Sequence, residues 1–139
     1  MSLIVARKQG NQLAIVSDTK LTYPNEDIKG QKNNPSEGVI KTVIINPNLC
    51  VSFAGDIDYA EKAIKELNNN HSIEETIKIL EKYHNRSDYK TEFLVCAGKP
   101  SPIIHKIKVN ESKDVHSSWI GDIKAFSSFQ ENLMGNKKN

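Results

Sequence analysis

The spacing of apolar positions changes several times along the chain. In some runs Ile, Val and Leu stand in continuous or alternating positions, which is the pattern of β-strands. The strands predicted on this basis are residues 3–7, 12–16, 39–45, 49–54, 93–97, 103–109 and 117–120. Gly10 and Asn11 suit the positive φ of a tight hairpin, and Pro47 presets the φ of a second turn. The sequence therefore predicts two successive hairpins followed later by further strands.

Downstream of the second hairpin the apolar period lengthens to about 3.6 residues, which is the period of an α-helix. Asp56 stands at the N-cap position of the first such stretch. Ser72 and Glu75 form a capping box before the second stretch. The predicted helices are residues 57–67, 73–85 and 122–134. Residues 22–38 are rich in Pro, Gly and Asn and have no period, so we expect a long loop there.

The order of these elements defines the expected fold class. Strands are grouped in hairpins and helices stand between the groups, which is typical of α+β proteins rather than of alternating βαβ units. Two antiparallel sheets stacked face to face, with helices on both outer faces, would bury the apolar stripes. We therefore expect a four-layer αββα sandwich, and the 139 residues suit a single domain over 1–139.

Composition excludes several kinds of partner. Lys and Arg number 19 against 17 Asp and Glu and are interspersed with them, so no basic stripe for nucleic acid is expected. No apolar run is long enough for a membrane span or a signal peptide, which predicts a cytoplasmic protein. Cys50 and Cys96 lie within apolar runs and are expected to be core thiols. The histidines have no ligand spacing, so neither a metal nor another cofactor is expected. These are His71, His84, His105 and His116.

Two segments of the sequence resemble a known family. SLIVARKQGNQLAIVSDTK and VIKTVIINPNLCVSFAGDIDYAEKAI are similar to the N-terminal half of proteasome β-type subunits and their bacterial relatives. These proteins are N-terminal nucleophile hydrolases with an αββα sandwich. Ser2 stands at the place of the nucleophile, and its interval to Asp18 equals the interval to the family's aspartate. Lys41 fills the lysine position, and Gly55 ends the turn before the first helix. WIGD at residues 119–122 is similar to the family's I-G-S-G turn.

The resemblance implies a chemistry for each of these residues. The Ser2 hydroxyl would attack an amide carbonyl while its own α-amino group, with a pKa near 8, accepts the proton. Lys41 would tune the hydroxyl and the amine, and Asp18 would orient Lys41. The backbone N–H of Gly55 would stabilise the oxyanion. The implied substrate is a peptide or a small amide.

Other features favour a catalytically inactive structural or regulatory subunit of the same fold. Met1 precedes Ser2 and blocks the amine, Asp122 replaces the serine of the turn, and the family's C-terminal segment has no counterpart. Asp18 could also be a simple turn residue, and Lys41 a solvated charge at a sheet edge. A sandwich shorter than the family's leaves sheet edges uncovered, so we expect a homo-oligomer.

Overall fold

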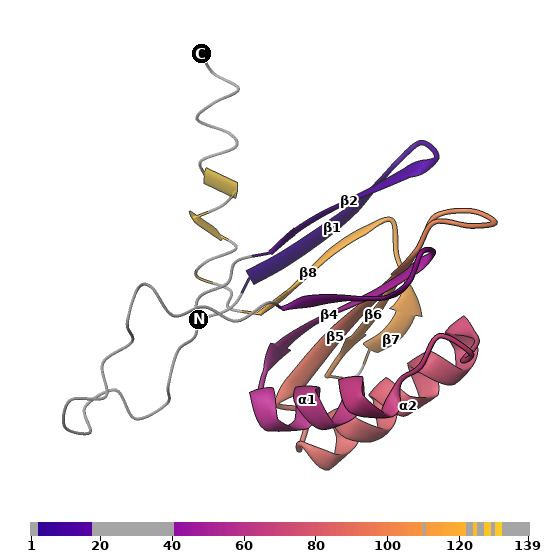
Figure 1. Cartoon of the computed structure of the whole chain (residues 1–139). Helices are drawn as coiled ribbons and strands as arrows, with labels where there is room; N and C mark the ends of the chain where they lie inside the picture. Colours follow the sequence, from indigo (N-terminus) through magenta and orange to yellow (C-terminus); the bar gives the residue numbers. More distant parts are fainter. Residues whose placement is uncertain are drawn as a thin grey trace, which may run out of the picture.

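A computed structural model describes residues 3–17, 41–109 and 111–121, together with positions 124, 127, 128, 130 and 131. This part of the chain is an α+β structure with two antiparallel sheets and two helices (Figure 1). The strands are β1 (Leu3–Gln9), β2 (Gln12–Ser17), β3 (Thr42–Asn46), β4 (Leu49–Gly55), β5 (Thr91–Ala97), β6 (Ile103–Lys108), β7 (Glu111–Asp114) and β8 (Ser117–Gly121). The helices are α1 (Ile57–Glu66) and α2 (Ile73–Arg86). The predicted α+β class and both hairpins are confirmed.

The two sheets are stacked. One has the strand order β2-β1-β8 and the other β3-β4-β5-β6-β7, and every neighbouring pair is antiparallel. The smaller sheet lies over one face of the larger sheet, and α1 and α2 cover the opposite face (Figure 1). The described layers are therefore the smaller sheet, the larger sheet and the helices. They correspond to the two stacked sheets and to one of the two helical layers of the expected sandwich.

The alternation of side chains along β4 and β5 separates two apolar cores. Successive strand residues point to opposite faces, so each strand contributes to both cores. The core beneath the helices includes Val51, Phe53, Ala60, Ala63, Leu80, Phe93 and Val95. The core between the sheets includes Ile4, Ala6, Ala54, Leu94, Cys96, Ile104 and Ile120. Both faces of the larger sheet are thus buried, which explains the continuous apolar runs of its central strands.

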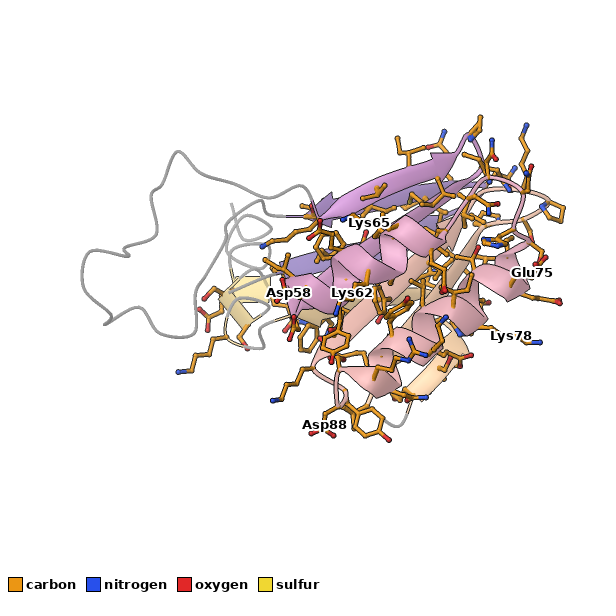
Figure 2. All side chains as sticks on the ribbon, turned by 60° about the horizontal axis from the view of Figure 1, so that its bottom comes forward. Asp58, Lys62, Lys65, Glu75, Lys78 and Asp88 are labelled. Carbon is orange, nitrogen blue, oxygen red and sulfur yellow. The ribbon has the colours of Figure 1, made fainter. Side chains whose placement is uncertain are left out.

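Both central helices begin where the capping residues predict. The Asp56 carboxylate accepts a hydrogen bond of 3.0 Å from the N–H of Asp58 at the start of α1. At α2 the Glu75 N–H donates to the Ser72 hydroxyl at 3.1 Å, and the Ser72 N–H donates to the Glu75 carboxylate at 3.2 Å. The second bond lowers the pKa of the Glu75 carboxyl. Charged side chains such as Lys62 cover the outer side of the helix layer (Figure 2).

Removing the Ser72 hydroxyl should destabilise the protein. In Ser72→Ala the Glu75 N–H loses its acceptor, and we expect the free energy of unfolding to fall by about 1 kcal/mol in urea titrations. The pKa of the Glu75 carboxyl is lower in the folded protein than in the unfolded chain. The stability contributed by its negative charge is therefore fully present above the unfolded pKa, and it is lost as the pH falls through the folded pKa. Ser101→Ala, at an exposed turn residue, is the control and should be neutral.

Some elements differ from those predicted from the sequence, and other predicted elements lie outside the described residues. Strand β7, whose residues ESKD are polar, was not predicted from the sequence. The start of β5 was predicted at Phe93, whereas β5 begins at Thr91. The predicted loop 22–38 lies outside the described residues. In the predicted C-terminal helix the described positions are helical and exposed, and its apolar residues lie outside the description; they are Ile123, Phe126, Phe129, Leu133 and Met134.

Candidate functional site

The beginning of β1 and the end of β2 lie side by side. Ile4 is the cross-strand partner of Ser17, and Leu3 is the partner of Gly121 on the other side of β1. The predicted nucleophile Ser2 directly precedes Leu3, and the predicted Asp18 directly follows Ser17. Both residues lie outside the described part of the chain. Their described neighbours nevertheless meet at one end of the smaller sheet.

The Glu92 side chain connects this end of the smaller sheet to the Gly55 end of β4. The Gly121 N–H donates a hydrogen bond of 2.9 Å to the Glu92 carboxylate. Glu92 is the cross-strand partner of Ala54, which directly precedes Gly55. Ile4 and Ala54 also belong to the same buried cluster between the sheets. The first residues of β1 and the last residues of β4 therefore lie at the same end of the stack, on the left in Figure 1.

Lys41 lies at this end and is buried. The Phe53 N–H donates to the Lys41 carbonyl at 2.9 Å, which fixes the backbone of Lys41 beside β4. Thr42 and Ser52 join the two strands further through their hydroxyl groups at 2.8 Å. Lys41 is only 2% exposed, so the interpretation of a solvated edge charge is wrong. A buried ammonium is costly unless charged or polar groups compensate it.

Gly55 has a backbone that other residues adopt poorly. Its φ is 99°, and a Cβ at this position would collide with the Lys90 carbonyl oxygen. The next residue, Asp56, donates its N–H to that same carbonyl at 3.2 Å. Glycine is therefore required for the close approach of β4 to the start of β5. Gly55 is also exposed, so a ligand could reach its backbone.

The direction of the Gly55 N–H follows from the strand pattern. Along an antiparallel strand successive N–H groups point to opposite neighbours. The Phe53 N–H points to the β3 side, where it donates to Lys41, and the Asp56 N–H points to the β5 side. The Gly55 N–H therefore points to the same side as that of Phe53, toward Lys41, which directly precedes β3. Two of the four predicted site residues, Lys41 and Gly55, thus lie at the same end of the β3–β4 hairpin, with Lys41 bonded to Phe53 two residues before Gly55.

Two charged residues at this end, Glu92 and Lys108, were not predicted from the sequence. Their side chains are about one-fifth exposed, and the Lys108 ammonium lies 4.0 Å from the Glu92 carboxylate. The same ammonium lies 3.7 Å from the centre of the Trp119 ring and 3.4 Å from the Trp119 carbonyl oxygen. In the sequence, Glu92 stands just before the apolar run of its strand. Residues two apart on a strand lie on the same face, so the spacing of Glu92 from Leu94 and Cys96 could have predicted that Glu92 lies between the sheets.

Other reactive groups lie apart from this end. Cys50 and Cys96 are cross-strand partners that face the core between the sheets, as free thiols. The hydrogen bond with Cys50, followed by burial, raises the pKa of the Cys96 thiol, which favours an inert protonated group. Within the described residues no three His, Cys, Asp or Glu side chains are grouped as metal ligands would be.

Two comparisons with known proteins add no family assignment. No family model matches the chain, and no curated protein matches its sequence. Among the described helices none has the length and apolar character that crossing a bilayer requires.

Proposed function

We propose that the protein is an N-terminal nucleophile hydrolase that cleaves amide bonds. More narrowly, we propose a proteasome-like member of that class, with a second helical layer that completes the αββα sandwich. The observation that carries the proposal is the meeting of three chain segments at one end of the sheet stack. These are the start of β1, the buried Lys41 and Gly55 with its positive φ. They are the segments to which the resemblance assigns the reaction.

The proposed reaction begins once Met1 has been removed. The free α-amino group of Ser2 accepts the proton of the Ser2 hydroxyl, and the oxygen attacks the carbonyl carbon of the substrate amide. The resulting oxyanion accepts a hydrogen bond from the Gly55 N–H. Collapse of this intermediate breaks the C–N bond, and the Ser2 ammonium returns the proton to the leaving amine. Water then hydrolyses the acyl-enzyme ester by the same proton route.

Lys41 and Asp18 are proposed to tune the nucleophile. A buried ammonium beside the Ser2 hydroxyl favours the ionised oxygen and disfavours protonation of the nearby amine, because like charges repel. Asp18, which follows the end of β2, would supply the carboxylate that compensates Lys41. The pKa of an unperturbed α-amino group, near 8, already lies close to neutral pH. A separate histidine base is then not needed.

We also propose that the protein acts on peptides or small amides as a cytoplasmic homo-oligomer. Support for association comes from apolar residues on strands at the edges of the sheets. Val16 on β2 is 58% exposed, and Ile44 on β3 is 76% exposed. Strand edges that carry exposed apolar side chains are typical sites of self-association. Sedimentation velocity of the native protein should show a species larger than 15.6 kDa.

Covalent labelling of Ser2 tests the proposed activity. The protein is prepared with Ser2 as its first residue and treated with a β-lactone, which acylates activated hydroxyl groups. We expect one adduct, located on the N-terminal peptide by mass spectrometry. The same protein with Met1 retained, and Ser2→Ala, should give none. An unlabelled protein with an intact fold would contradict the proposal and favour a catalytically inactive member of this fold.

A further inference from the structure

Glu92 occupies an unusual place for a carboxylate. It alternates with Leu94 and Cys96 along β5, and these two residues lie in the core between the sheets. Its side chain is 20% exposed, and one carboxylate oxygen accepts the Gly121 N–H at 2.9 Å. A carboxylate in the space between two sheets requires compensating donors and charges. It is therefore a costly group to retain only for packing.

Lys108 compensates this carboxylate and is itself held in place. Ile107 is the cross-strand partner of Phe93, so the next residue, Lys108, lies opposite Glu92. Its ammonium is 4.0 Å from the second Glu92 oxygen and 3.7 Å from the centre of the Trp119 ring. Such a contact between a cation and a ring is attractive and limits the positions available to the ammonium. Both oxygens of Glu92 are thus engaged.

Gly121 links Glu92 to the start of β1. Gly121 is the last residue of β8 and the cross-strand partner of Leu3. In the larger sheet, Glu92 on β5 is the cross-strand partner of Ala54 on β4, directly before Gly55. The bond between Glu92 and Gly121 therefore connects the strand that begins after Ser2 with the strand that ends at Gly55. It bridges the two sheets next to the Lys108–Trp119 contacts and the buried apolar cluster that contains Ile4 and Ala54.

We propose that Glu92 is a positioning residue that fixes the start of β1, and with it the Ser2 nucleophile, relative to Gly55. The proposal rests on the function proposed above and adds a residue to it. Glu92 acts through Gly121 and does not contact the substrate. Acylation requires the hydroxyl and the oxyanion donor to be held together, and displacements of about 1 Å can cost about a hundredfold in rate.

Two substitutions at Glu92 separate its hydrogen bond from its charge. Glu92→Ala removes the acceptor of the Gly121 N–H, whereas Glu92→Gln keeps an acceptor oxygen and removes only the charge near Lys108. Glu66→Ala serves as a control, because Glu66 forms an ion pair with Lys82 at 2.6 Å between the two helices. All three variants are compared with the native chain that begins at Ser2.

Hydrogen exchange of the Gly121 amide and the rate of Ser2 acylation are measured together. In Glu92→Ala we expect Gly121 exchange to accelerate at least about tenfold, since a hydrogen bond to a charged acceptor is lost. Acylation should slow about a hundredfold. Glu92→Gln should keep most of the Gly121 protection and most of the acylation rate. Glu66→Ala should change neither the exchange nor the acylation rate. A Glu92→Ala protein with unchanged Gly121 exchange, or with accelerated exchange and an undiminished acylation rate, would overturn the proposal.

These readouts also distinguish the two proposals. If the native chain beginning at Ser2 is not acylated, the proposed hydrolase is refuted. Gly121 exchange still reports in that case whether Glu92 fixes the start of β1. If the native chain is acylated and Glu92→Ala reacts at the same rate, only the positioning role of Glu92 is refuted.

Discussion

Lys41→Met should abolish acylation of Ser2 while leaving a folded protein. Methionine has a similar length and apolar stem, so it can occupy the buried position of Lys41 without its charge. In the proposed reaction, the ionised Ser2 oxygen then loses its stabilising ammonium. We expect the second-order rate constant with a β-lactone to fall at least about a hundredfold. The rate is compared between folded proteins, as judged by near-ultraviolet circular dichroism.

Two further variants make this prediction specific. Lys65→Met places the same substitution at an exposed lysine of α1, whose side chain is 75% exposed, and should leave the rate unchanged. Under the proposed pairing of Asp18 with Lys41, combining Lys41→Met with Asp18→Asn leaves no uncompensated carboxylate, so the double variant should regain stability without regaining rate. A Lys41→Met protein that is acylated at the native rate would remove Lys41 from the proposed site.

Gly55→Ala should destabilise the fold more than any other single methyl addition considered. The φ of 99° disfavours an L side chain, and the added Cβ would collide with the Lys90 carbonyl oxygen, which is backbone and cannot rotate away. Separation of β4 from the start of β5 would relieve the overlap but would weaken the Asp56 N–H bond to Lys90. We expect a loss of about 3 kcal/mol in the free energy of unfolding, measured by urea denaturation.

Gly98→Ala is the matched control for Gly55→Ala. Gly98 has no positive φ, and an added Cβ would meet its nearest neighbour, the Asn48 side-chain oxygen, at the ordinary contact distance of 3.5 Å. Its stability should change by less than about 0.5 kcal/mol. Equal stabilities for the Gly55→Ala and native proteins would contradict the described conformation of this turn.

The helices were predictable because the chemistry that begins them is local. Asp56 and Ser72 each bond to an N–H within the next turn, so a few consecutive residues determine the start of α1 and α2. The apolar period then identifies the buried face. The same local logic identified the turn at Gly10 between β1 and β2, where φ is positive.

β7 was missed because its stability is not encoded in an apolar pattern. Its residues are polar, and it lies at the edge of the sheet beside β6. Glu111 forms ion pairs with Lys106 across the strands and with Lys113 on its own strand, at 2.7 and 3.7 Å. Cross-strand charge pairs of this kind depend on register, which a single sequence does not provide.

The candidate site was predictable in part. The spacing of Lys41 and Gly55 around a hairpin was sufficient to expect both at one end of β3 and β4, because a hairpin returns the chain to its start. The burial of Lys41 was not predictable, since it depends on how the strands and layers pack around it. Glu92 escaped notice for the same reason, because its partner Gly121 comes from a distant segment.

The most direct measurement is the distance between the Ser2 Oγ and the Lys41 Nζ in a crystal structure of the chain that begins at Ser2. The proposed hydrolase requires these atoms within hydrogen-bonding distance, about 3 Å, with the Gly55 N–H facing the same space. A separation beyond about 10 Å would place the hydroxyl outside any direct influence of the ammonium at physiological salt and would contradict the proposed function.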